Sequence, residues 1–160
     1  MTDIYTSGKR TSIMSKVRSK DTKPELFVRK LLFKAGYRYR LQVSNLPGKP
    51  DIVLKKYKTA LFVHGCFWHG HTGCHRSSRP ADNKQFWETK IAGNIARDNN
   101  VSQALLYDGW RVLIIWECAC LKTRSNELLS KIEAFLKSEA TSAEIGKNDF
   151  NTPSGNATPT

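Results

Sequence analysis

Residues 61–75, with the sequence LFVHGCFWHGHTGCH, constrain this chain more than any other segment. They hold all four of its histidines, two of its four cysteines and three glycines. The apolar residues 60–63 before the first histidine predict a buried strand, so the histidines begin where a strand ends. A glycine-rich loop at a strand end is a rigid place to present chemical groups. The segment therefore predicts a metal site, a catalytic site or both.

The cysteines favour metal binding over disulfides. Cys66 and Cys74 lie in the histidine-rich loop, whereas Cys118 and Cys120 follow an apolar run far downstream. We expect a soluble, cytoplasmic protein, because no stretch approaches the ~20 apolar residues that a membrane helix needs, and disulfides are rare in that compartment. Histidines and cysteines clustered in a short loop, completed by a distant cysteine, are typical of zinc ligands.

The charge predicts a polyanionic partner. The chain has 26 Lys and Arg against 14 Asp and Glu, a formal net charge of +12 and a sequence pI of about 9.7. For a basic domain of this size, nucleic acid is the leading candidate. The alternative is a basic surface that is merely solvated.

The length of 160 residues predicts one domain with a substantial core. Residues 1–20 form a polar, basic arm that could dock on phosphates or lie in a groove, or could be a frayed terminus. The globular domain is expected at 21–138. Residues 139–160 are rich in Ser, Thr, Asn, Pro and Gly, so we predict a disordered tail.

The elements predict an α/β fold. Thr22 is a good N-cap, Pro24 suits the first helical turn, and Glu25 supplies a capping-box carboxylate for a helix that ends at Gly36. Hydrophobic periodicity predicts further helices and strands. The strands are expected at 37–41, 51–54, 60–63 and 111–116, and the helices at 83–107 and 126–137. This order predicts a sandwich around a small mixed sheet.

Asp51 is a second candidate for chemistry. It follows Pro50 at the mouth of a short apolar strand, and such an Asp is usually a turn residue. However, a Pro-Asp pair that opens one strand, with polar residues ending the next, is the layout of many metal-dependent nucleases. There the carboxylate holds Mg²⁺ against the scissile phosphate.

Five motifs carry a specific resemblance. They are RSKDTKPEL, LPGKPDIV, FVHGCFWHGH, FWETKI and GWRVLIIWEC, spread in order over residues 18–118. Together they resemble the very short patch repair (Vsr-type) DNA mismatch endonucleases. The resemblance implies a restriction-endonuclease-like three-layer α/β sandwich with a structural zinc. It also implies a bacterial, monomeric, Mg²⁺-dependent enzyme that nicks double-stranded DNA 5′ of the T in a T:G mismatch left by deaminated 5-methylcytosine.

The resemblance also assigns catalytic roles. Asp51 and the main-chain carbonyl of Val63 would hold Mg²⁺. His69 would activate water, oriented by Asp98, while His64 and Glu25 would be second-shell or water-ordering groups. The chemistry agrees, since phosphodiester hydrolysis needs charge neutralisation and a base that works near neutral pH. The acidic-x-Lys element of the wider nuclease superfamily is absent. His69 could instead be a core or solvent histidine.

The implied zinc ligands are Cys66, His71, Cys74 and Cys118. Three thiolates and one imidazole leave no open position, so the site is expected to be structural. Cys120, His75 and His69 remain competing ligands. The resemblance further implies an aromatic wedge that unstacks bases. Its members would be Met14, Phe67, Trp68 and Trp87, although the chain alone favours buried packing for Trp87.

Two other functions remain open. A zinc-stabilised DNA-binding module without catalysis would need only the basic charge, the aromatics and the zinc. A restriction-type nuclease that cuts both strands would use Asp51 but would leave the aromatic wedge unexplained. Asp51 with the pair His64 and His69 favours catalysis, because a pure binder needs no metal-binding carboxylate beside a base.

Overall fold

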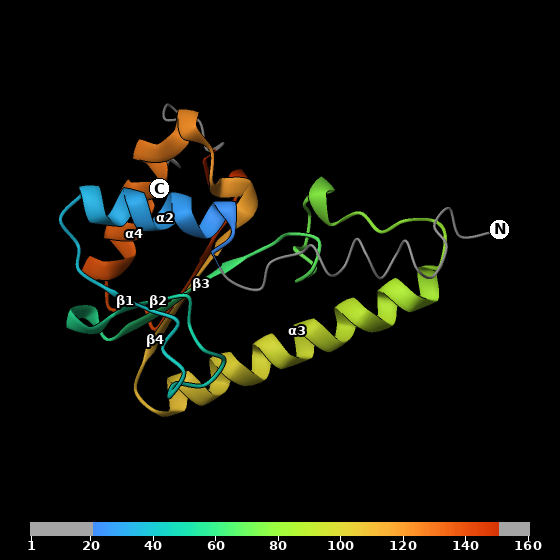
Figure 1. Cartoon of the computed structure of the whole chain (residues 1–160), viewed down its shortest axis with the longest axis horizontal. Helices are drawn as coiled ribbons and strands as arrows, with labels where there is room; N and C mark the ends of the chain where they lie inside the picture. Colours follow the sequence, from blue (N-terminus) through green and yellow to red (C-terminus); the bar gives the residue numbers. More distant parts are fainter. Residues whose placement is uncertain (1–20, 151–160) are drawn as a thin grey trace, which may run out of the picture.

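The structure, a computed structural model, describes residues 21–150 of the chain. In this part three α-helices surround one five-stranded sheet (Figure 1). The expected arm, 1–20, and with it Met14, lies outside the described residues, as do residues 151–160. The helices are α2 (Lys23–Lys34), α3 (Lys84–Tyr107) and α4 (Ser125–Lys137). The strands are β1 (Arg40–Leu41), β2 (Ile52–Leu54), β3 (Thr59–His64), β4 (Arg111–Trp116) and β5 (Ser142–Ile145).

The sheet is mixed, as predicted. Its order is β1-β2-β3-β4-β5, with antiparallel pairing through β3 and parallel pairing from β3 to β5. β3 is central and all six of its residues are buried. Val63 pairs with Ile115 and His64 with Trp116, so β3 and β4 end together. The loops that leave both strands therefore meet at one end of the sheet.

Alternation along β3 produces the two covered faces. Leu61 and Val63 pack into the larger core with α2 and α4, while Ala60 and Phe62 pack against Leu105 of α3. Successive side chains of a strand point to opposite faces, so one apolar strand serves both layers. Figure 1 shows α2 and α4 together on one side of the sheet and α3 on the other. This arrangement is consistent with a restriction-endonuclease-like α/β fold.

The predicted start of α2 is confirmed. The Thr22 hydroxyl accepts from the Glu25 amide at 3.3 Å, and Pro24 lies in the first turn. The strand expected at 37–41 is shorter, however, because β1 contains only Arg40–Leu41. The Tyr37 amide donates to the Leu32 carbonyl at 3.0 Å and so closes the end of α2. Tyr37 therefore belongs to the helix C-terminus and not to the strand.

Helix α3 has the extent that the sequence predicted, and Asn83 is its N-cap residue. Asn83 has a left-handed φ of 57°, and its side chain makes no capping hydrogen bond. Only Ile91 and Leu105 are buried along the 24 residues. The helix contacts the sheet near its C-terminal end and extends beyond it (Figure 1). Phe86, near the N-terminal end of the helix, is consequently 41% exposed.

The predicted disordered tail is wrong for residues 139–150. β5 pairs in parallel with β4, and the chain continues into a short 3-10 helix, Lys147–Phe150. Ile145 and Phe150 are buried in the larger core. The polar composition of these residues did not predict a strand. An edge strand needs few apolar residues, because its neighbour supplies the hydrogen bonds. Within residues 21–150, no helix has the length and apolar character to cross a membrane.

Candidate active site and metal centre

Asp51 lies at the start of β2, beside the end of β3. Its carboxylate accepts a hydrogen bond from the Val63 amide at 2.7 Å, which fixes it against the central strand. Burial raises the pKa of Asp51 to about 7; the bond from Val63 opposes this shift and the nearby charge of Glu25 adds to it. A carboxylate that is desolvated and beside another negative charge is stabilised by a cation. Asp51 thus has the environment of a metal ligand.

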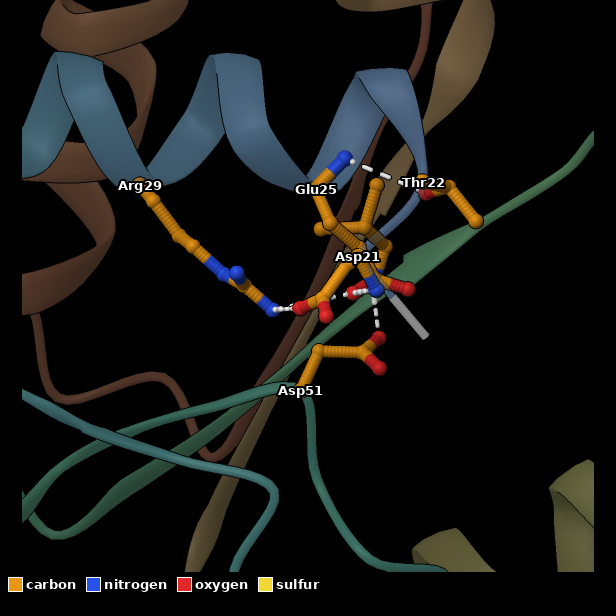
Figure 2. A network of polar contacts seen from close by, with 6 residues as sticks. Asp21, Thr22, Glu25, Arg29 and Asp51 are labelled. Atoms are coloured by element: carbon orange, nitrogen blue, oxygen red, sulfur yellow. Dashed lines mark hydrogen bonds and ion pairs between the residues drawn. The ribbon is translucent and has the colours of Figure 1, made fainter. Parts of the chain in front are cut away.

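Glu25 is the second carboxylate of this region and is only 3% exposed. It accepts from the Asp21 amide at 2.9 Å and from the Arg29 guanidinium at 3.3 Å. A capping box would pair this carboxylate with the amide of Thr22, whereas it accepts from the amide one residue earlier, that of Asp21. Figure 2 shows the Glu25 and Asp51 side chains beside each other, one from α2 and one from the residue just before β2. Burial is the main cause that raises the pKa of Glu25.

Two histidines and Asp98 form the other half of the site. The His69 Nδ1 lies 2.6 Å from the Asp98 carboxylate, and the His64 and His69 rings stack with centroids 3.8 Å apart and planes 4° apart. The Asp98 contact favours a proton on Nδ1 and leaves Nε2 as the basic nitrogen of His69. Burial lowers the pKa of His64 to about 3, so this ring is neutral. A neutral neighbour lets His69 bind a proton without facing a second positive charge.

The carboxylates and the histidines share one cavity of about 860 Å³. Its lining includes every catalytic residue that the sequence predicted: Glu25, Asp51, Val63, His64, His69 and Asp98. Lys49 and Arg97 also line it. Carboxylates that can hold a cation, an imidazole that can take a proton and two cations that can contact phosphates are the groups that phosphodiester hydrolysis requires.

The four predicted zinc ligands converge beside this cavity. The Sγ atoms of Cys66, Cys74 and Cys118 and a ring nitrogen of His71 all lie within 4.8 Å of one another. The His71 Nδ1 is 3.6 Å from the Cys118 Sγ. Tetrahedral zinc, with bonds of roughly 2.1 Å to nitrogen and 2.3 Å to sulfur, gives an N···S separation of about 3.6 Å. The donor set and its spacing therefore fit a closed zinc site.

The environment of the thiols supports a metal. All four cysteines are free, and burial raises the pKa of both Cys66 and Cys118. Buried thiols packed this closely are stabilised as thiolates only by a cation. Cys120 does not join them, because its Sγ points to the carbonyls of Pro24 and Trp116. Within residues 21–150, His75 is also outside the cluster.

An aromatic cluster lies over the N-terminal end of α3. The ring centroids of Phe67 are 5.1 Å from Trp68 and 5.3 Å from Trp87, and the two tryptophans are 5.8 Å apart. All three residues are half-buried. The Asn94 amide donates to the Trp68 carbonyl at 2.8 Å and ties this loop to the helix. The packing expected for Trp87 is thus within this cluster and not in the core.

Comparisons with known proteins agree with this arrangement. The sequence model of the family described as DNA mismatch endonuclease Vsr matches residues 2–76. The DNA mismatch endonuclease Vsr of Escherichia coli is 37% identical over 148 residues, which cover 91% of this chain and 94% of the relative. The chain belongs to the Vsr family. The type II nicking enzyme V.NmeAIP of Neisseria meningitidis is 46% identical over 83% of this chain and 98% of its own length.

Membership of the Vsr family confirms the resemblance that the five motifs predicted. The family consists of DNA endonucleases, which agrees with the net charge of +12. A further nicking enzyme, V.XorIIP of Xanthomonas oryzae, is 48% identical over 74% of this chain and 86% of its own length. DNA is therefore the substrate class of this Vsr-family protein.

Sequence reasoning missed Lys49 and Arg97 as lining residues of the cavity. Lys49 sits in the turn before Asp51 with a left-handed φ of 47°, and Arg97 precedes Asp98 on α3. Each is one basic residue in a chain with 26, so its type carries no signal. Their positions could have identified them, because each lies within two residues of a predicted catalytic carboxylate.

Proposed function

We propose that this Vsr-family endonuclease nicks one strand of duplex DNA 5′ of the T in a T:G mismatch, and so starts very short patch repair of deaminated 5-methylcytosine. One observation carries the proposal. The bonded pair His69–Asp98 and the carboxylates of Asp51 and Glu25 line a single cavity that also reaches Phe67 and Trp68. A base, a cation site and a surface for unpaired bases are thus adjacent.

The residues of the cavity divide the hydrolysis between them. His69 takes a proton from the attacking water at Nε2, and Asp98 stabilises the imidazolium that forms. Mg²⁺ held by Asp51 and the Val63 carbonyl would neutralise charge on the scissile phosphate. Glu25 orders water beside this position, where Arg29 and the Asp21 amide fix its carboxylate. Stacking on His64 holds the ring of His69 in place.

The metal centre has a structural role in this proposal. Zinc bound by Cys66, His71, Cys74 and Cys118 has no free coordination position and joins the loop after β3 to the residues after β4. His69 lies inside that loop, two residues before a ligand. Fixing the loop therefore fixes the base. The same loop would present Phe67 and Trp68 to the mismatch, together with Trp87 from α3 and with Met14.

A wedge suits a T:G pair for an energetic reason. Unstacking a base step costs a few kcal/mol, and this cost is lowest where pairing is already weak. The half-buried aromatic cluster offers flat surfaces for the displaced bases. Discrimination would then come from the deformability of the DNA as well as from contacts to base edges.

A nicking assay tests the proposal. Duplexes labelled at the 5′ end of either strand, with and without one T:G mismatch, are incubated with the purified monomer and Mg²⁺. We expect one cut, 5′ of the mismatched T, and none in the matched duplex. Cuts in both strands of a matched duplex would support a restriction-type nuclease. Tight binding without a cut in any strand would support a non-catalytic module.

A further inference from the structure

Residues 142–150, the C-terminal cover, lie against the Cys/His cluster that the proposed function assigns to zinc. The cover consists of β5 and the 3-10 helix Lys147–Phe150. Since β5 runs parallel to β4, its end reaches the same end of the sheet as Cys118. None of the cover residues is a candidate ligand in the cluster. Two consecutive backbone positions of the cover contact the cluster.

The first contact is a hydrogen bond to a ligand. The Lys147 amide donates to the Cys118 Sγ at 3.3 Å, and the Cys118 side chain is nearly inaccessible, at 2% exposed. An amide that donates to a thiolate withdraws part of its negative charge and fixes its orientation. Three thiolates on one Zn²⁺ carry a net negative charge, so this bond stabilises the loaded site.

The second contact is a close approach that only glycine permits. A Cβ built on Gly146 would lie 2.8 Å from the His71 Cε1, 3.1 Å from its Nε2 and 3.7 Å from the Cys118 Sγ. Gly146 is not among the residues with positive φ, so the requirement is for space and not for backbone freedom. The ring of His71 cannot yield easily, because it stacks on Trp116 with centroids 4.1 Å apart.

The cover is itself anchored on both sides of these contacts. On the β5 side, the Glu144 carboxylate accepts from the Trp116 indole at 2.7 Å. In the turn, the Asp149 carboxylate accepts from the Gly146 amide at 2.7 Å. At the far end, the carbonyl of the buried Phe150 accepts from the Arg124 guanidinium at 3.2 Å. The positions of the two contact residues are therefore determined by the fold.

We infer that the C-terminal cover is a functional part of the metal centre: the Lys147 amide and the close approach of Gly146 hold Cys118 and His71 in place and slow the loss of zinc. The cover replaces water around the ligands and blocks the approach of competing chelators. Partners of metal ligands typically change metal affinity by about 10–100-fold when altered. The inference rests on the proposed zinc site, and its test separates the two.

The test measures zinc content and then zinc release. Full-length protein is assayed for bound metal, and the transfer of zinc to an excess of a chromogenic chelator is followed over time. Gly146→Ala should release zinc about 10–100-fold faster than the wild type. Asn148→Ala, an exposed position in the same turn, should release it at the wild-type rate. Wild-type protein without zinc would refute the proposed site itself.

A zinc-containing wild type with an unchanged rate in Gly146→Ala would overturn the role of the cover alone. A second measurement needs no variant and so does not depend on its folding. In protein loaded with cadmium-113, the Lys147 amide proton should show a scalar coupling to the metal through the N–H···S bond. If the metal couples to the ligand residues but not to this proton, the inference is wrong.

Discussion

The proposed catalytic cavity and the proposed metal centre lie at the same end of β3, yet their side chains differ in burial and charge. In the cavity the His69 and Asp98 side chains are 29% and 24% exposed, and Asp51 and Glu25 place two carboxyl groups side by side. In the proposed metal centre Cys66 and Cys118 are almost fully buried, the His71 ring stacks on Trp116, and the Lys147 amide donates to the Cys118 Sγ. The cavity is therefore an open site with two neighbouring carboxyl groups, and the Cys/His cluster is a closed site.

The contrast shows how the chain supports an open site. Charged groups that must meet DNA and water cannot be held by burial, because burial would prevent access. In the proposed function, zinc would instead fix the loop that carries His69 at Cys66 and His71, on either side of the proposed base. The amide of His71 also donates to the Cys66 carbonyl at 2.9 Å. The closed site therefore provides the rigidity that the open site lacks.

The largest expected effect comes from opening the closed site. Cys118→Ser should lose the zinc and much of the folded structure, because a structural metal contributes folding free energy directly. Cys120→Ser is the matched control, since its Sγ points away from the cluster, and it should keep its zinc. Elemental analysis and a thermal melt of both variants check this. A folded, zinc-containing Cys118→Ser protein would refute the ligand assignment.

The next effect concerns charge in the open site. Asp51→Asn should abolish Mg²⁺-dependent nicking, because it removes the negative charge that holds the cation while retaining the shape of the side chain. Binding to a mismatched duplex and zinc content should be unchanged. Single-turnover nicking, a binding titration and elemental analysis separate these quantities. Nicking at the wild-type rate would exclude Asp51 as the Mg²⁺ ligand.

Replacing the base should have a smaller but still large effect. His69→Ala should lower the nicking rate by about 10²–10⁴-fold, the usual contribution of general base catalysis. His64→Ala removes the stacked ring but not the base, so its rate should fall less. Both rates are measured on one T:G duplex, with zinc content as the check of the fold. If His69→Ala retains zinc and the wild-type rate, His64 becomes the candidate base.

The smallest effect is expected at the boundary between the two sites. Trp68→Ala should bring the affinities for matched and mismatched duplexes closer together, since a wedge contributes most where pairing is weak. Affinity for matched DNA should change little. Binding titrations with both duplexes, beside a thermal melt, provide the measurement. A lower melting temperature with unchanged discrimination would show that Trp68 serves packing alone.

Local patterns predicted the parts of the site that are close together in sequence. The clustering of Cys66, His71 and Cys74 in one loop predicted a metal site, and the structure brings these side chains together with Cys118. The apolar strands that flank the loop predicted the sheet. Asp98 came only from the family resemblance, because nothing local relates a helical Asp to a His 29 residues earlier. Their contact depends on how α3 crosses the sheet, which is a tertiary property.

The C-terminal cover was mispredicted for a different reason. Its composition is polar, and Ile145 and Phe150 are the only large apolar side chains buried within it. The hydrogen bonds that order β5 come from β4, and the contacts of Gly146 and Lys147 use backbone atoms. Side-chain patterns cannot report interactions that the main chain makes. Glu25 shows the converse case, since a capping motif predicted its place correctly but not its proximity to Asp51.

Because α3 is one continuous helix, insertions and deletions within it should be poorly tolerated. Trp87 and Asp98 are eleven residues apart on one helix, or about 16 Å at 1.5 Å per residue. Each inserted or deleted residue between them would turn Trp87 and Asp98 by about 100° relative to each other around the helix axis. Trp87 and Asp98 could then not both keep their contacts with the loop that carries His69. The loop at 76–82 precedes the helix, so a change of length there would not rotate one helical residue relative to another. We expect length variation among relatives to collect in that loop and to be absent from the helical interval.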